Sequence, residues 1–391
     1  MKKNFELLIN RFETVFDLFD GQIYFVGGSV RDLLLNKPVS DIDMATPLTP
    51  DKASALLQSA GYKVIPTGLD YGTITFLMPD KTPIELTSFR KDVSCDGRRA
   101  VVAYSDSMEM DSVRRDLTVN ALYMGKDGQI FDFHHGQKDL KKRRIRFIGN
   151  AEDRINEDAL RILRFFRFWG EFGGKKPNAD TMKICRKNHR LLLNLSKERQ
   201  RDELFKILSS ANPTPIIRYL YRLKLWQMIT DIQPNFKALK HIVSYENHLG
   251  QKANPLLRLL ALTNGIVPNL KLSKKQIDFS KRLTKSMEIP INSTHQARAV
   301  LYLYGRDVML ARILMRNKKI SYAAFCFYER LSLPVFPITA QDLISKGLTG
   351  AKISKAMSQM EHFWISSKFL AQKSLVLQSF FGYDDEKGDK K

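Results

Sequence analysis

Apolar residues are patterned differently in the two parts of the chain. Short apolar runs rich in β-formers predict buried strands at 23–26, 73–78, 83–89 and 100–104. A helical pattern occupies residues 50–61 and ends at Ala60-Gly61. The runs 119–124 and 129–133 flank Lys126-Asp127-Gly128 and predict a hairpin. We therefore expect an α+β domain with a small sheet at the amino-terminal end.

The strand pattern stops beyond Asn150. From there to about residue 330 the apolar residues follow helical spacing. Glycine and proline interrupt this pattern at Gly173-Gly174, Asn212-Pro213, Gly265 to Pro268 and Pro290. The segment after Gly382 is charged and is expected to fray. The second part of the chain is thus predicted to be helical throughout.

Composition places the chain among globular proteins. It has 391 residues, 43% of them hydrophobic, which is enough for two to four domains. No apolar run approaches the ~20 residues of a membrane span. Glu6, Arg11 and Glu13 interrupt any signal-peptide core after Met1-Lys2-Lys3, so we expect a soluble, cytoplasmic protein. Reduced, structural thiols are expected at Cys95, Cys185 and Cys326.

A large positive charge points to a polyanionic partner. Lys and Arg number 63 against 41 Asp and Glu, a formal net charge of +22. Phosphate contacts from such residues supply most nucleic-acid affinity. Without a membrane segment or amphipathic anchor, RNA or DNA is favoured over lipid. A lysine-rich composition without a binding role is the alternative.

The first chemical motif is Gly27-Gly28-Ser29-Val30-Arg31-Asp32, which follows the strand at 23–26. Glycine lacks a Cβ, so this backbone can lie against a triphosphate. A helix is expected to open at 33–35, and the N–H groups at its start favour phosphate. Neither a P-loop nor a Rossmann glycine motif is present. A plain Gly-Gly turn is the alternative.

Acidic residues follow at Asp41-Ile42-Asp43. On an extended strand, residues two apart point to the same face, so both carboxylates can reach one metal site. Mg²⁺ binds few carboxylates and completes its shell with phosphate and water. Glu85, within the alternating strand 84–90, offers a third carboxylate. These residues suggest metal-dependent phosphoryl or nucleotidyl transfer, with solvated strand ends as the alternative.

Arginines dominate two further motifs. In Arg114-Arg115-Asp116-Leu117, guanidiniums suit phosphate and ribose oxygens, and the carboxylate can accept from ribose hydroxyls. A surface ion-pair cluster is the alternative. Arg161, Arg164 and Arg167 follow at steps of three along an otherwise apolar helix, which implies a large anion or a polar cleft.

Asp158 lies three residues before Arg161, so on a helix the two are expected to be neighbours. Together they can read a base edge. Asp158 would accept from the exocyclic amine of cytosine or adenine, and Arg161 would donate to the ring nitrogen. Uracil and guanine present oxygen at that position and would be repelled. An intrahelix salt bridge is the alternative, but it leaves the arginine row unexplained.

The ordered motifs GGSVRD, DID, IELTSFR, RRDLTVNA and EDALRILRFFRF resemble the class II tRNA nucleotidyltransferase and bacterial poly(A) polymerase family, within the polymerase-beta-like superfamily. The resemblance is dense over residues 22–170, and Leu195 to Arg199 with Glu203-Leu204 extends it to about 210. It implies an α+β nucleotidyltransferase head with a small mixed sheet over 1–149, a helical neck over 150–212, and a helical body and tail over 213–391.

The resemblance also implies roles for individual residues. Asp41 and Asp43 would bind Mg²⁺, with Glu85 as the supporting carboxylate. Asp158 and Arg161 would select the base of the incoming CTP or ATP. The remaining nucleotide-binding residues would be Gly27, Gly28, Arg31, Arg115, Asp116, Asn120, Arg164 and Arg167.

The activity implied is template-independent addition of CCA to the 3′ end of tRNA, with two metal ions and release of pyrophosphate. The stretch 90–110, with Asp96 to Arg99, resembles the loop linked in the family to the switch from C to A, and favours full CCA addition. Residues 68–73 resemble the T-G-x-x-H-G-T stretch of the tRNA enzymes, although Tyr71 replaces its histidine. Basic helices such as 271–285 are expected to hold the tRNA backbone. A poly(A) polymerase or A-adding enzyme, and a non-catalytic RNA-binding protein, are the alternatives.

Overall fold

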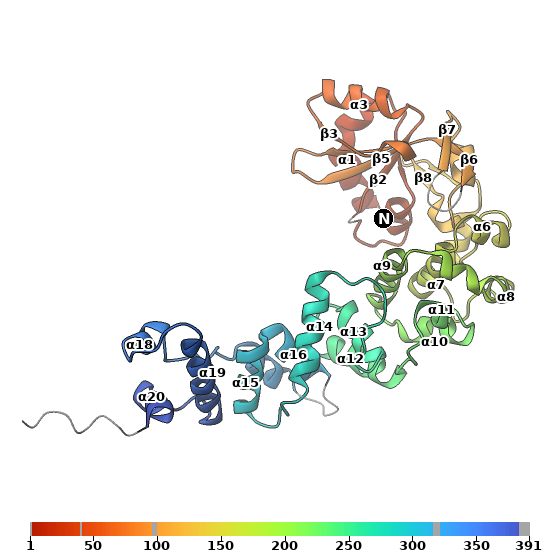
Figure 1. Ribbon diagram of the computed structural model, residues 1–391. Helices are drawn as coiled ribbons and strands as arrows, with labels where there is room; N and C mark the ends of the chain where they lie inside the picture. Colours follow the sequence, from red (N-terminus) through yellow and green to blue (C-terminus); the bar gives the residue numbers. More distant parts are fainter. Residues whose placement is uncertain (1, 40, 96–99, 316–320, 383–391) are drawn as a thin grey trace, which may run out of the picture. The chain divides into compact units, whose positions relative to one another are not determined.

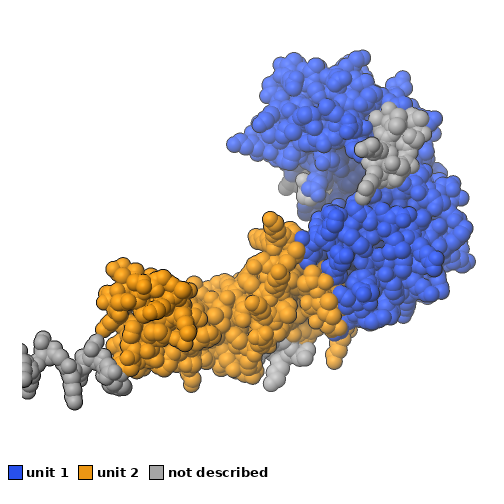
Figure 2. Space-filling model, in the orientation of Figure 1, with its two compact units in different colours: residues 1–236, 253–255, 268–272 blue, residues 237–252, 256–267, 273–391 orange. Residues whose placement is uncertain are grey.

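The structure is a computed structural model that describes residues 2–39, 41–95, 100–315 and 321–382 (Figure 1). Residues 96–99 of the family loop and the charged end after Gly382 lie outside these ranges. The chain forms two compact units (Figure 2). Unit 1 holds residues 1–236, 253–255 and 268–272, and unit 2 holds residues 237–252, 256–267 and 273–391. The expected domain boundaries at 149 and 212 both fall inside unit 1 and stay predictions.

Unit 1 contains the mixed sheet that the sequence predicts. Its strand order is β3-β4-β5-β2-β1-β8-β9, in which β2 and β5 are parallel and the other neighbours antiparallel. A separate hairpin is formed by β6 and β7. The strands are β1 Tyr24–Val26, β2 Asp43–Thr46, β3 Lys63–Gly68, β4 Thr73–Leu77, β5 Pro83–Ser88, β6 Arg90–Cys95, β7 Ala100–Tyr104, β8 Tyr123–Met124 and β9 Ile130–Phe131.

The sequence pattern located β1, β4, β5 and β7, but it missed β3. That strand lies at the sheet edge, is largely exposed, and its pairing with β4 is irregular between Ile65 and Gly68. A partly polar edge strand with an internal proline lacks the alternation of a half-buried strand. The expected hairpin at 119–133 is shorter than predicted, because Thr118–Asn120 forms a 3-10 turn before β8.

One face of the sheet is covered by α1 Lys2–Leu18 and α3 Pro50–Ser59 (Figure 1). Helix α1 was not predicted, although its Phe12 and Phe16 each pack edge-on against Phe25 of β1, with ring centroids 5.3 Å apart. Met44 of β2 belongs to the same core. Successive strand residues alternate between faces, so Asp43 lies on the opposite face, where Ala45 of the same strand belongs to a second, smaller buried cluster. Asp43 thus lies on the face of the sheet away from α1 and α3.

The rest of unit 1 is mainly helical, and the helix expected to open at 33–35 instead begins at Gly28. Gly27 has φ +66°, which turns the chain from β1 directly into that helix. The breaks predicted at 173–174 and 212–213 are confirmed. The helices are α2 Gly28–Leu34, α4 Met108–Val113, α5 Gly136–Lys141, α6 Ala151–Glu157, α7 Leu160–Phe172, α8 Ala179–Lys187, α9 Lys197–Leu208, α10 Thr214–Arg222 and α11 Trp226–Ile229, with 3-10 turns at Leu69–Tyr71, Thr118–Asn120 and His189–Asn194.

The described part of unit 2 contains helices and loops without a strand. Its core includes a buried ion pair between Glu246 and Arg258, 2.6 Å apart. The predicted breaks at 265–268 and 290 lie between consecutive helices. The helices are α12 Phe236–His248, α13 Pro255–Leu262, α14 Lys274–Ser286, α15 Thr294–Tyr304, α16 Arg306–Leu314, α17 Tyr322–Glu329, α18 Ala340–Ile344, α19 Ala351–Ser366 and α20 Lys373–Phe381.

The described side chains include two of the three cysteines. Cys185 and Cys326 are free thiols, as expected, whereas the side chain of Cys95 lies outside the described part. Among the described helices, none combines the length and apolar character that crossing a membrane requires.

Candidate nucleotide-binding site

One polar cavity of about 510 Å³ in unit 1 gathers most of the predicted site residues. Of the predicted site residues, Glu85 does not line the cavity. Asp32, Phe168 and Lys206 line it but were not predicted as site residues. The lining residues are Gly27, Gly28, Arg31, Asp32, Asp41, Asp43, Arg115, Asp116, Asn120, Asp158, Arg161, Arg164, Arg167, Phe168 and Lys206. Residues from distant motifs therefore share a single site.

The paired glycines form a close-fitting part of the cavity wall. A side chain at Gly27 would be strained by its φ of +66°, and its Cβ would lie 3.4 Å from the Asn120 carbonyl oxygen and 3.5 Å from Arg115 Nη1. The Gly27 N–H donates to the Leu122 carbonyl at 2.9 Å. Backbone at Gly27 and Gly28 thus borders the cavity directly, as expected for a phosphate cradle.

Ser29 connects the glycine turn to the acidic motif. Its hydroxyl donates to the Asp41 carbonyl at 3.1 Å and accepts from the Asp43 N–H at 2.9 Å. Only Asp43 belongs to β2, and Asp41 lies two residues before the strand, yet both line the cavity. Sequence reasoning gave Ser29 no role, because a buried serine that binds backbone has no distinctive spacing.

Negative charge is concentrated around Asp43. Strand β2 runs parallel to β5 and places Asp43 beside Glu85. Burial, followed by the Glu85 carboxylate, raises the pKa of Asp43 to about 6, although Arg115 opposes the rise. Carboxylates that disfavour each other's charge suit a cation. Among the described residues no three metal-ligating side chains converge, so Asp41 and Asp43 fit a metal that takes its other ligands from phosphate and water.

A chain of hydrogen bonds crosses the cavity wall. Arg31 Nη1 donates to Asn120 Oδ1 at 2.6 Å, and Asn120 Nδ2 donates to Asp116 Oδ1 at 3.2 Å. Asp116 Oδ2 accepts from Arg164 Nε at 2.6 Å. Burial alone would raise the pKa of Asp116, but Arg164 and these hydrogen bonds lower it, so the carboxylate stays ionised. The network joins three of the predicted motifs.

Asp158 is not on a helix with Arg161, contrary to what the spacing predicted, and the salt bridge between them that was the alternative interpretation is not formed. Helix α6 ends at Glu157, and Asp158 is extended, with φ −153° and ψ 107°. Arg199 Nη2 lies 2.8 Å from Asp158 Oδ2. Arg161 instead pairs with Glu157, four residues earlier. Both Asp158 and Arg161 nevertheless line the cavity.

The arginine row lies on one side of α7, as its spacing predicts. Arg167 Nε lies 2.5 Å from Glu203 Oε1, a partner that sequence spacing could not reveal. Phe168 gathers the guanidiniums of Arg31, Arg164 and Arg167, which lie 5.2, 5.4 and 4.0 Å from its ring centroid. Such cation–π contacts hold like charges together without neutralising them. The row thus lines the cavity as guanidiniums that are each paired with a carboxylate, Glu157, Asp116 and Glu203 respectively.

Fold and site together define a nucleotidyltransferase-like head joined to helices that carry arginines. The family model "Poly A polymerase head domain" matches residues 23–146, and "Probable RNA and SrmB- binding site of polymerase A" matches residues 176–239. The chain is 30% identical over 380 residues to the "CCA tRNA nucleotidyltransferase 1, mitochondrial" of Danio rerio, covering 92% of this chain and 86% of the relative. The chain thus belongs to the family of tRNA nucleotidyltransferases and poly(A) polymerases.

Two further comparisons agree with this assignment. Over 229 residues, 56% of this chain and 55% of the relative, the chain is 40% identical to the CCA-adding enzyme of Oceanobacillus iheyensis. The crystal structure of the Bacillus stearothermophilus CCA-adding enzyme in complex with CTP superimposes with a TM-score of 0.70 at 25% identity, covering 92% of this chain and 93% of that one. The resemblance found in the motifs, and the fold class it implied, are confirmed.

Proposed function

We propose that this chain adds C, C and A in turn to the 3′ end of tRNA, from CTP and ATP, without a nucleic-acid template and with release of pyrophosphate. One observation carries the proposal: a single cavity holds Asp41 and Asp43 together with Asp158 and Arg161. Such a reaction needs carboxylates that can bind a metal for phosphoryl transfer. It also needs a carboxylate and a guanidinium that can recognise the base. The names of the relatives support the same activity.

Asp41 and Asp43 would supply carboxylate ligands for Mg²⁺, with Glu85 as the supporting carboxylate on the neighbouring strand. The bound metal would lower the pKa of the tRNA 3′-hydroxyl and stabilise the departing pyrophosphate. Glu85 lies beside Asp43 and concentrates negative charge there, which favours a hard cation over an empty site.

Arginine side chains would hold the triphosphate and sugar. Arg31 and Arg115 lie on the head side of the cavity, beside the glycine turn, and Arg164 and Arg167 lie on α7. Guanidiniums bind phosphate oxygens in a fixed fork, so they fix the direction of the triphosphate as well as its affinity. Asp116 and Asn120 would support this set through their bonds to Arg164 and Arg31.

Base choice would rest on Asp158 and Arg161. The Asp158 carboxylate would accept from the exocyclic amine of cytosine or adenine, and Arg161 would donate to the ring nitrogen. Each side chain is held by a separate partner, Arg199 and Glu157 respectively, so neither depends on the other for its orientation. Protein side chains would thus replace a template strand.

The remaining helices would bind tRNA by its backbone. Helix α14 exposes Lys274, Lys275, Lys281 and Lys285, and the whole chain has a net charge of +22. Phosphate contacts of this kind position an RNA without reading its sequence. We also propose that the protein is located in the cytoplasm, where newly transcribed tRNA would be its substrate.

The test is an incorporation assay on a tRNA transcript that ends before CCA. The full chain, Mg²⁺ and each nucleotide singly or CTP with ATP are mixed, and the 3′ ends are sequenced. We expect C-C from CTP alone, C-C-A from the mixture, and no incorporation by the Asp41→Ala variant. A long A tract without CTP incorporation would identify a poly(A) polymerase, and equal products from wild type and variant would identify a protein without this catalysis.

A further inference from the structure

Two side chains that the proposed mechanism does not use, Tyr123 and Asp111, bind Arg115. Its Nε donates to the Tyr123 hydroxyl at 2.9 Å, and its Nη2 donates to Asp111 Oδ2 at 3.0 Å. The guanidinium also lies 5.0 Å from the centroid of the Tyr123 ring. Tyr123 and Asp111 do not line the cavity, whereas Arg115 does. Among their described side-chain hydrogen bonds, those to Arg115 are the ones that reach the cavity wall.

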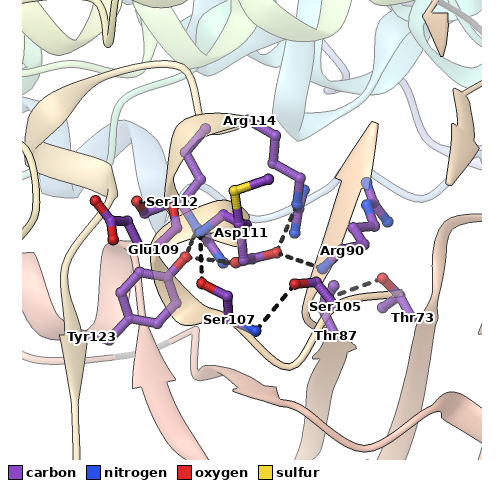
Figure 3. Close-up of polar contacts among 12 residues, drawn as sticks. Thr73, Thr87, Arg90, Ser105, Ser107, Glu109, Asp111, Ser112, Arg114 and Tyr123 are labelled. Carbon is purple, nitrogen blue, oxygen red and sulfur yellow. Dashed lines mark hydrogen bonds and ion pairs between the residues drawn. The ribbon is translucent and has the colours of Figure 1, made fainter. Parts of the chain in front are cut away.

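Asp111 is fully buried and has several donors (Figure 3). Tyr123 donates its hydroxyl proton to Asp111 Oδ2 at 2.5 Å, and Arg114 Nε donates to Oδ1 at 2.7 Å. The backbone N–H of Arg90, the first residue of β6, also points to Oδ1 at 3.3 Å. Burial by itself would raise the pKa of Asp111, but Arg115 and Arg114 lower it, so the carboxylate is ionised. Asp111 is a fixed negative charge tied to three segments.

The same bonds determine which part of Arg115 faces the cavity. With Nε and Nη2 engaged, Nη1 is the remaining nitrogen, and it lies 3.5 Å from the position of a Cβ on Gly27. That position is the wall predicted to meet the triphosphate. A guanidinium held at two nitrogens loses little conformational freedom when the third binds an anion. Burial raises the pKa of the Tyr123 hydroxyl, so it keeps the proton that it donates.

We propose that Tyr123 and Asp111 are positioning residues that aim Arg115 Nη1 at a phosphate of the incoming nucleotide. The proposal rests on the proposed function for the identity of the ligand, a nucleoside triphosphate. The role of Tyr123 depends on its hydroxyl, which accepts from Arg115 and donates to Asp111 at the same time. Phenylalanine at this position would keep the ring under the guanidinium but would release Nε.

The experiment compares the full-chain Tyr123→Phe variant with wild type. Competition with a fluorescent nucleotide gives the affinities of CTP, inorganic pyrophosphate and cytidine. We expect Tyr123→Phe to weaken CTP and pyrophosphate about five- to tenfold and to leave cytidine within twofold. Tyr62→Phe is the matched control, because it removes a hydroxyl that bonds Thr14 at 3.2 Å elsewhere in unit 1, and it should change nothing. Equal weakening of cytidine and CTP would overturn the proposal.

A double-mutant cycle with Arg115→Ala separates positioning from a general structural effect. Once Arg115 is removed, Tyr123→Phe should have no further effect on pyrophosphate affinity, and a loss as large as in wild type would overturn the proposal. Asp111→Asn provides a second variant, with the same expected phosphate-dependent loss. Since pyrophosphate binding needs no turnover, this result is independent of the incorporation assay. If the wild-type protein binds pyrophosphate but adds no nucleotide, the proposed function is wrong, whereas the positioning role of Tyr123 and Asp111 still stands.

Discussion

Asp158 is bound by Arg199, not by Arg161: Arg199 Nη2 lies 2.8 Å from Asp158 Oδ2. Asp158 follows the end of α6 and is extended, so the spacing of three residues does not make it a helical neighbour of Arg161. Arg199 belongs to α9, and Glu157 holds Arg161. The two residues proposed to read the base are thus oriented by different partners and can be perturbed separately.

Replacing Asp158 with alanine should damage nucleotide selection more than nucleotide transfer. A hydrogen bond to a charged group contributes roughly 1.5–3 kcal/mol, so discrimination against UTP should fall by about one to two orders of magnitude. The measurement is kcat/KM for CTP, ATP and UTP on matched tRNA ends. Asp180→Ala, at an exposed position of α8, is the control. Unchanged discrimination in Asp158→Ala would contradict the assigned role.

The raised pKa of Asp43 predicts a pH-dependent gain in stability for Asp43→Asn in metal-free buffer. Folding raises this pKa from its usual value near 3.8 to about 6. A carboxyl whose pKa is raised by folding stabilises the folded state at pH values below about 4. This stabilisation is lost as the pH rises through the folded-state pKa of about 6. Asp43→Asn should therefore be more stable than wild type at pH 8, by on the order of 3 kcal/mol, and nearly equal at pH 4.

Urea unfolding in EDTA at both pH values measures this difference. Glu6→Gln, which removes a charge from the exposed side of α1, should show no comparable change. The stabilised Asp43→Asn protein should also be inactive. A variant that is less stable than wild type at pH 8 would show that the charge of Asp43 is compensated without a metal.

Asn120→Ala should weaken both the fold and nucleotide binding. The variant removes the acceptor of Arg31 Nη1 and a donor to buried Asp116. Leaving such buried groups without partners costs about 1–3 kcal/mol. We expect a lower denaturation midpoint and a several-fold higher KM for both CTP and ATP. An effect on one nucleotide alone would contradict a shared phosphate role.

Association with tRNA should weaken steeply with salt, because counterions are released at each neutralised phosphate. Charge reversal at Lys281 and Lys285 of α14 should make the slope of log K against log salt shallower, by about one unit for each phosphate that a lysine no longer neutralises. Lys52→Glu on α3 is the control, since Lys52 is exposed and lies outside the segment 176–239 that matches the RNA-binding family model. An unchanged slope in the double variant would place the tRNA-binding surface away from α14.

Motifs with local physical causes were predictable from sequence. The turn predicted at Gly27-Gly28 is present, with φ +66° at Gly27, and Arg161, Arg164 and Arg167 line one cavity from a single helix, as their spacing predicts. Asp43 and Glu85 lie on adjacent strands, as expected for alternating segments. The arginine row follows from periodicity over a few residues, whereas the pairing of β2 with β5 joins segments that are far apart in the sequence.

The partners of these residues could not be predicted in the same way. Arg199 reaches Asp158 from 41 positions away, and Glu203 reaches Arg167 from 36. Such pairings depend on how helices pack, which no local pattern encodes. Glu157 and Arg161 are four residues apart, but the end of α6 and the extended Asp158 separate them, so helical spacing does not account for their pairing.

Asp41 and Asp43 are proposed to carry the transfer chemistry, while Asp158 and Arg161 read the base. A crystal structure of the full chain with CTP and Mg²⁺ tests both halves at once. We predict that the α-phosphorus lies beside Asp41 and Asp43, with the cytosine amine within hydrogen-bond distance of Asp158. A CTP molecule whose α-phosphorus lies away from Asp41 and Asp43, or whose base does not contact Asp158, would contradict it.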